Sequence, residues 1–118
     1  MTKQTDEYSH TVIHAVEALI EEIPADSIVS RTILSDGETK ILLFGFAPGQ
    51  ELSEHTAPRS AMLHFLRGQA RLTLGDDTLE AEPGTLAHMA PNLPHSIHAH
   101  SEVLMLLIML PREGANQS

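Results

Sequence analysis

Turn residues interrupt the chain repeatedly after Pro24, and they limit the fold more than any other feature of the sequence. Asp36-Gly37 and Pro48-Gly49 are two of these turns, and the segments between them are short and rich in leucine and β-branched residues. Such segments at a spacing of about ten residues predict an antiparallel all-β sandwich or barrel. The expected strands span residues 28–34, 39–46, 51–55, 61–67, 69–74, 78–82, 86–90, 95–100 and 103–110.

The clearest helical pattern lies near the N-terminus. Apolar residues recur at three- and four-residue spacing from Val12 to Ile23, and Pro24 follows. This pattern predicts one amphipathic α-helix that ends at the proline. His10 and His14 stand four residues apart at its start. They either share a metal ion or remain two solvated histidines on the polar edge of the helix.

The length of 118 residues indicates one domain with a single core. We expect residues 1–26 to form a helical segment that packs on the barrel or on a dimer partner. Residues 27–111 are expected to form the barrel, and residues 112–118 a flexible tail. The absence of cysteine excludes a disulfide framework and a thiolate nucleophile.

Charge and hydropathy bear on partners and location. The formal net charge is −9 and the seven basic residues are scattered, so nucleic-acid binding, which needs a basic face, is disfavoured. The longest apolar run, residues 103–110, covers eight residues, far fewer than the roughly 20 of a membrane helix. The N-terminus has no signal-peptide pattern. We therefore expect a cytoplasmic protein with no membrane contact.

Two expected strands are apolar on both faces. Residues 62–66 read Met-Leu-His-Phe-Leu, and residues 104–109 read Leu-Met-Leu-Leu-Ile-Met. A strand of this kind is covered on both sides, and the outer cover comes from the N-terminal helix, the first strand or a second subunit. We therefore expect a homodimer.

Two glycine-marked turns each lead to a histidine at the end of an expected strand. His55 follows the turn at Gly49, and His95 follows the turn at Gly84. Neutral imidazole is the commonest metal ligand, so these histidines, brought together by a sheet, could hold a divalent metal ion. A site for iron, manganese, nickel or zinc needs at least three protein ligands and an open position. A third ligand is therefore required.

The spacing of these glycines and histidines resembles the two sequence motifs of the cupin family, over residues 27–110. The matching positions are Gly49, His55 and Gly68 in the first motif and Gly84, Pro91 and His95 in the second. Asn92 stands where the second motif usually has another glycine, and asparagine also tolerates left-handed backbone. The resemblance implies a small single-domain bacterial cupin with a leading helix, built as an RmlC-like jelly roll, or double-stranded β-helix.

The same resemblance shows which metal ligands are missing. Ala57 stands at the place of the second histidine of the first motif, and Ala61 at the place of its glutamate. Two of the four ligands that the family usually has are thus absent. One of them is the carboxylate that would offset the charge of a metal ion.

Four other residues could complete the site. His64 is the best third ligand, because a histidine amid hydrophobic residues needs a ligand or a hydrogen bond. Strict alternation from Ala61 instead turns His64 outward, as a core or interface histidine, unless a bulge shifts the register. His88 is a second such histidine. Glu54 and Arg59 flank the first motif histidine, where they either orient a ligand or form a solvated pair.

The sequence leaves two functions open. The first is a metal-dependent enzyme, dioxygenase-like or isomerase-like, that acts on a small polar molecule. The second is a non-catalytic barrel with a degenerate metal site, which binds a small molecule as a sensor or carrier. Convergence of three imidazoles would favour the first function. Convergence of only two, in a mouth lined by leucine and methionine, would favour the second.

Overall fold

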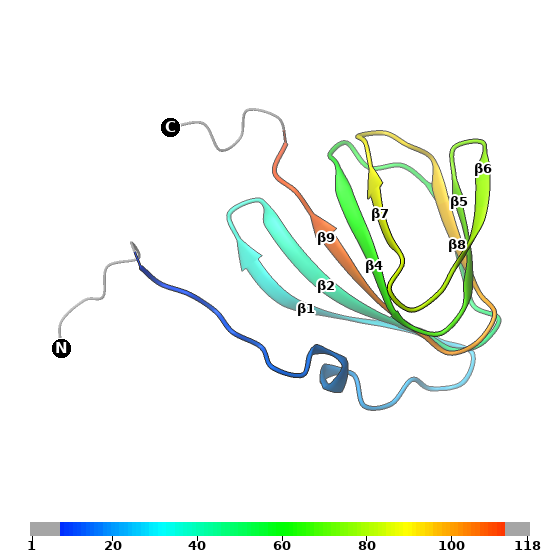
Figure 1. The fold of residues 1–118 in the computed structure, drawn as a ribbon, viewed down its shortest axis with the longest axis horizontal. Coiled ribbons are helices and arrows are strands. Elements are labelled where there is room, and N and C mark those ends of the chain that lie inside the picture. Colours follow the sequence, from blue (N-terminus) through cyan, green and yellow to red (C-terminus); the bar gives the residue numbers. More distant parts are fainter. Residues whose placement is uncertain (1–7, 113–118) are drawn as a thin grey trace.

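The computed structural model describes residues 8–112 and shows an all-β chain (Figure 1). Its strands are β1 (Ile28–Asp36), β2 (Thr39–Phe46), β3 (Glu51–His55), β4 (Ala61–Arg67), β5 (Ala70–Leu74), β6 (Asp77–Ala81), β7 (Leu86–Met89), β8 (His95–Ala99) and β9 (Val103–Met109). Each strand begins and ends within two residues of an expected strand. The predicted all-β class is therefore confirmed.

The strands form two antiparallel sheets. The five-stranded sheet has the order β1-β2-β9-β4-β7, and the four-stranded sheet has the order β3-β8-β5-β6. Strands far apart in sequence become neighbours, since β2 pairs with β9 and β3 pairs with β8. Figure 1 shows the two sheets as the walls of a barrel, which is the predicted jelly roll.

The inner faces of both sheets bury one apolar core. Phe46 and Phe65 of the five-stranded sheet, with Leu72 and Ile97 of the four-stranded sheet, are at most 1 % exposed. Successive side chains of a strand point to opposite faces, so every second residue of these strands enters the core. Burial of each such side chain contributes roughly 1.5–3 kcal/mol, and the packed strands fix the positions of the loops at their ends.

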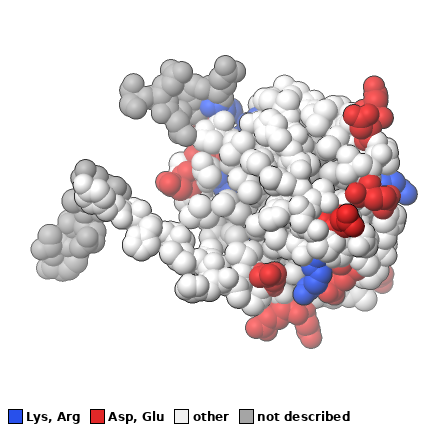
Figure 2. All heavy atoms as spheres, in the orientation of Figure 1, with Lys and Arg blue, Asp and Glu red and all other residues white. Residues whose placement is uncertain are grey.

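The outer face of the four-stranded sheet is polar. Glu51, His98, Arg71 and Glu80 are paired in register across its four strands. On the side of the molecule seen in Figure 2, acidic side chains gather near this sheet, and basic side chains stand singly. Acidic side chains thus predominate on the surface seen there, as the net charge of −9 implies.

The N-terminal segment is not the α-helix that its spacing predicts. Within the described residues the only helix is the short 3-10 helix Val16–Leu19, and no side-chain cap precedes it. The apolar residues of the segment pack on the outer face of the five-stranded sheet, where Ile20 and Leu43 belong to one buried cluster. Because a short helix is marginal by itself, this packing determines the backbone. His10 and His14 consequently share no helix face.

Residues 1–7 and 113–118 lie outside the described residues, and so does most of the expected tail, residues 112–118. Arg112 is still held to the barrel, because its Nη2 atom donates a hydrogen bond to Oε2 of Glu38 at 2.7 Å. No helix of the described chain is long and apolar enough to cross a membrane.

The turn between β4 and β5 requires glycine. Gly68 has a φ of +91°, and a Cβ atom there would collide with the carbonyl oxygen of Glu102. Gly37, in the turn between β1 and β2, has a φ of +61°, but nothing lies within 4 Å of an added Cβ atom. Alanine substitutions at these two positions therefore separate the cost of left-handed backbone from the cost of steric overlap.

We expect Gly68→Ala to destabilise the fold more than Gly37→Ala. Left-handed backbone costs alanine roughly 1–2 kcal/mol, which is the whole expected loss at Gly37. At Gly68 the collision adds to this cost, and we expect a total of about 3 kcal/mol or more. Denaturant unfolding of both variants beside the wild type measures the two losses. Equal losses would mean that the backbone near Glu102 moves aside at no cost.

Candidate functional site

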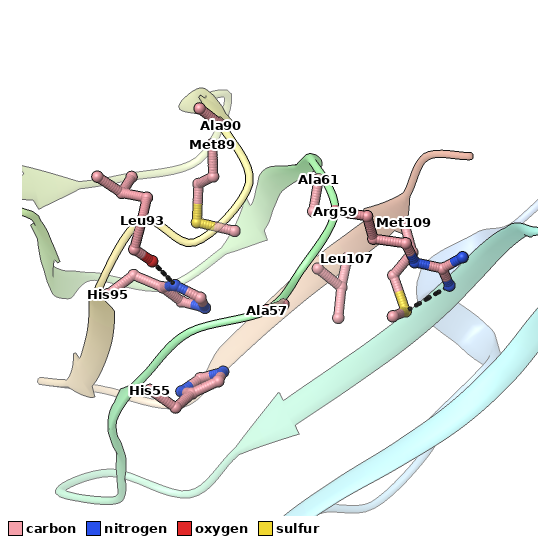
Figure 3. A pocket seen from close by; sticks show the side chains of 10 residues that line it. All are labelled: His55, Ala57, Arg59, Ala61, Met89, Ala90, Leu93, His95, Leu107 and Met109. Carbon is pink, nitrogen blue, oxygen red and sulfur yellow. Dashed lines mark hydrogen bonds between the residues drawn. The ribbon is translucent and has the colours of Figure 1, made fainter. Parts of the chain in front are cut away.

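A cavity of about 220 Å³ opens between the sheets, where the β3–β4 and β7–β8 loops meet the ends of β4 and β9 (Figure 3). Its walls are mainly apolar, with a histidine pair and one arginine as the exceptions. The lining residues are His55, Ala57, Arg59, Ala61, Met89, Ala90, Leu93, His95, Leu107 and Met109.

His55 and His95 meet at this cavity because β3 pairs with β8. His55 ends β3, His95 begins β8, and the two are Cα partners in the ladder. Their ring centroids are 4.2 Å apart, with 58° between the ring planes. His95 is 7 % exposed, whereas His55 is exposed at the mouth of the cavity. The sheet therefore brings together the two histidines that the sequence singles out.

An irregularity in β3 turns His55 toward the cavity. The register shifts between Leu52 and His55, where β3 has one residue more than β8. In a regular strand, Glu54 would lie opposite His95, and His55 would face outward. The extra residue is a β-bulge that reverses the alternation. Glu54 is exposed and is not among the residues that line the cavity.

The backbone orients both imidazoles. Nδ1 of His55 lies 2.9 Å from the carbonyl oxygen of Ser53, and Nδ1 of His95 lies 2.9 Å from that of Leu93. A carbonyl oxygen can only accept, so Nδ1 is the donor and carries the proton of each neutral ring. The lone pair of each Nε2 atom then remains available to accept a proton donor or to bind a cation. Figure 3 shows both rings beside the cavity.

A backbone hydrogen bond joins the two loops that carry the histidines. The amide of Asn92 donates to the carbonyl oxygen of Ala57 at 2.7 Å. Asn92 has a φ of +68°, which confirms the left-handed asparagine expected at this position. The amide of Gly75 also donates to the carbonyl oxygen of Pro94 at 2.8 Å. These contacts hold the loops in place without any ligand.

Arg59 is the one cationic side chain among the lining residues. Its Nη2 atom donates to Sδ of Met109 at 3.7 Å, and its Nη1 atom lies 3.9 Å from Oε1 of Glu38. The closer partner of Glu38 is Arg112, at 2.7 Å. Hydrogen bonds from the side chain and backbone of Arg112, helped by the charge of Arg59, lower the pKa of Glu38 to about 2. Two guanidinium groups thus share one carboxylate, which leaves a positive charge beside the cavity.

Two other candidate ligands lie outside the cavity. His64 alternates with the buried Ala61 and Leu63 on β4, so its half-buried side chain faces outward, as strict alternation predicts. His88 is exposed and lines a separate groove with Pro58 and other residues. In residues 8–112 no group of three His, Cys, Asp or Glu side chains is placed to hold a metal ion. The cavity therefore presents two nitrogen donors, fewer than the three ligands that iron, manganese, nickel or zinc requires.

Sequence reasoning allowed for methionine at the mouth of the cavity but did not identify which methionines line it. Met89 on β7 and Met109 on β9 are both Cα partners of Ala61 on β4. The two thioether side chains consequently flank a residue that carries only a methyl group. Their position depends on the strand order β9-β4-β7, which no local sequence pattern shows.

The sequence matches the family model of the cupin domain over residues 42–110. The chain belongs to the cupin family. The matched region runs from β2 to β9 and contains both cavity histidines, so the resemblance of the glycine and histidine spacing is confirmed. Membership supports a small-molecule-binding cupin as the general role. No curated protein matches the chain.

Solved structures share the fold of this cupin. A cupin superfamily protein from Desulfitobacterium hafniense has a TM-score of 0.77 and 24 % identity, over 86 % of this chain and 93 % of that one. A conserved protein of unknown function from Streptococcus pyogenes has a TM-score of 0.74 and 27 % identity, over 97 % and 98 %. An RmlC-like cupin from Desulfovibrio desulfuricans has a TM-score of 0.72 and 24 % identity, over 87 % and 99 %. These similarities confirm the predicted RmlC-like jelly roll.

We expect the ion pair of Glu38 and Arg112 to lose its effect in acid. Because folding lowers the pKa of Glu38 from 4.5 to about 2, its contribution to stability is present above the unfolded value and disappears as the pH falls between these two values. Melting temperatures measured across this range should therefore fall more for the wild type than for Glu38→Gln. The control is Glu102→Gln, because the wild-type Glu102 carboxylate lies 3.5 Å from Arg67 in another ion pair. Equal falls for wild type and Glu38→Gln would contradict the role of this ion pair.

Proposed function

We propose that this cupin binds a small organic acid in the cavity, as a carrier or sensor. The observation that carries the proposal is the convergence of two imidazoles, and no third, in a mouth lined by alanine, leucine and methionine. Ligand pockets are mostly apolar with a few placed polar groups, and this cavity has that composition. At about 220 Å³ it suits a molecule smaller than most drug-sized ligands.

Arg59 supports an acid as the ligand. Its side chain is 17 % exposed, so a carboxylate that reaches it binds in partly desolvated surroundings. The thioether of Met109 is a weak acceptor for the guanidinium, and Glu38 is bound mainly by Arg112. A ligand carboxylate would therefore give Arg59 a better partner than it has within the chain.

The histidine pair supports a donor group on the same ligand. Both Nε2 atoms accept, because both rings carry their protons on Nδ1. A hydroxyl or amino group of the ligand could donate to them. The apolar side chains of Leu93 and Leu107 would then contact its carbon skeleton. The proposed ligand class is thus a short-chain carboxylate with a branched apolar body and a hydroxyl or amino group.

A metal-dependent enzyme is the second candidate function. The observation that favours it is the orientation of the imidazoles, since an Nδ1–H bond to a backbone carbonyl is how proteins commonly present Nε2 to a metal ion. The third protein ligand that iron, manganese, nickel or zinc requires is not among the cavity residues. No reaction step is therefore assigned to such a metal.

We expect Arg59→Met to weaken carboxylate binding by about tenfold or more, because it removes a charged hydrogen-bond donor. The probes are isovalerate, β-hydroxyisovalerate and the uncharged isovaleramide, titrated while the amide resonances of the cavity residues are followed by NMR. The wild type should bind the carboxylates and not the amide. Arg67→Met, which removes an exposed arginine elsewhere, is the control. Equal affinity of Arg59→Met and wild type would overturn the proposal.

We also infer that the chain forms a homodimer through the outer face of its five-stranded sheet. Leu86, His64 and Leu106 are register partners across β7, β4 and β9, and Leu86 is 57 % exposed. The N-terminal segment covers the neighbouring part of this face and then runs away from the barrel (Figure 1), with Tyr8 83 % and Val12 65 % exposed. In a two-fold dimer, the N-terminal segment of one copy can cover the exposed part of the outer face of the five-stranded sheet in the other copy.

Leu86→Asp should convert the dimer to a monomer, because a carboxylate buried without a partner in an apolar interface is strongly unfavourable. Sedimentation equilibrium measures the mass. Thr78→Asp, at an exposed position of β6, places the same charge on the other sheet and should leave the mass unchanged. A wild type that sediments as a monomer would exclude the dimer.

A further inference from the structure

The cavity combines imidazole nitrogen with thioether sulfur. Met89 and Met109 stand on either side of Ala61 in one row across β7, β4 and β9. In Figure 3 the Met89 side chain extends from its strand toward His95, into the cavity that both residues line. Ala61, which lies between them, carries only a methyl group.

The donors differ in how much of their bonding capacity is already used. The Nε2 atoms of His55 and His95 remain available, because the chain binds both rings through Nδ1. The sulfur of Met109 accepts from Arg59 at 3.7 Å, so a positive group already lies beside it. Met89 is 4 % exposed, and within residues 8–112 its sulfur accepts no hydrogen bond from Arg59, whose Nη2 atom donates to Met109. Met89 is therefore the sulfur donor best placed to join the histidine pair.

Charge then selects the kind of cation. The three donors are neutral, the lining residues include the cationic Arg59 and no carboxylate, and the bulge keeps Glu54 outside the cavity. A dication in these apolar surroundings has no anion to offset the large cost of desolvating it. A monovalent ion loses less hydration, and thioether and imidazole ligands are those preferred by soft copper(I).

We propose that the cavity binds one copper(I) ion through Nε2 of His55, Nε2 of His95 and the sulfur of Met89. This donor set differs from the three histidines and one glutamate that the family motif implies, because Ala57 and Ala61 replace two of those residues. The site uses the histidine pair of the proposed function, but it does not use Arg59.

Anaerobic titration with copper(I), in competition with a chromophoric copper(I) chelator, tests the site. The wild type should bind one ion per chain. Met89→Leu, which keeps the volume of the side chain and removes the sulfur, should weaken binding by about tenfold or more. His55→Ala combined with His95→Ala should fold normally and lose the ion. Met62→Leu, on the outward face of β4 beside Ala61, should bind as the wild type does.

Three outcomes would overturn the copper site, two of them from the titrations. One is equal copper(I) affinity of Met89→Leu and wild type, and the other is an unchanged affinity when both cavity histidines are replaced. X-ray absorption of the copper-loaded wild type should also show a sulfur neighbour that Met89→Leu lacks. Its absence from the wild type would equally reject the proposal.

Two variants distinguish failure of this inference from failure of the proposed function. Arg59→Leu, which brings no sulfur atom into the cavity, should weaken binding of the carboxylate probes by about tenfold or more and should bind copper(I) at least as tightly as the wild type, because it removes a positive charge and no metal ligand. Met89→Leu should weaken copper(I) binding and should change carboxylate affinity less, because leucine keeps the volume and the apolar character of the cavity wall. If only one of these two expected results is not obtained, only the corresponding site is rejected. His98→Gln with His100→Gln removes a histidine pair from the outer face of the other sheet and should leave both unchanged.

Discussion

The apolar contact between the inner faces of the two sheets is the interaction on which the rest of the structure depends. Phe46, Phe65, Leu72 and Ile97 fill the middle of the barrel, and the antiparallel ladders determine which side chains enter it. At one end the filling stops, because Ala61 contributes only a methyl group. The cavity is thus the unfilled end of the hydrophobic core, since Ala61 and Met89 of its wall belong to that core and Leu93 and Leu107 pack against it.

This apolar end of the barrel carries a few polar groups, which hydrogen bonds to the backbone hold in place. The imidazoles are oriented by carbonyl groups of their own loops, and the Asn92 amide joins one loop to the other. Methionine side chains are flexible and polarizable, so the two methionines of the cavity can adapt to a ligand that the histidines bind. A small acid and a soft cation would use the same two nitrogens, and the remaining contacts, with Arg59 or with Met89, would separate them.

The sequence predicted the strands well, because glycine and proline turns specify where each strand ends. It predicted the helix wrongly, since the same apolar spacing from Val12 to Ile23 is satisfied by packing on the outer face of a sheet. The alternation of inward and outward side chains along the strand correctly predicted that His64 faces outward. Two parts of the site were beyond local reasoning. The bulge before His55 depends on pairing with β8, and the position of Met89 depends on three strands that are distant in sequence.

The bulge in β3 also makes the site sensitive to register. Glu54 and His55 are adjacent, and the extra residue decides which of them lies opposite His95. If the bulge moved to the far side of His55, the same sequence would place a carboxylate beside His95 and turn the imidazole to solvent. The cavity would then offer an anionic oxygen to its ligands in place of a neutral nitrogen. A shift in strand pairing could therefore change the ligand preference of this barrel before any lining residue is substituted.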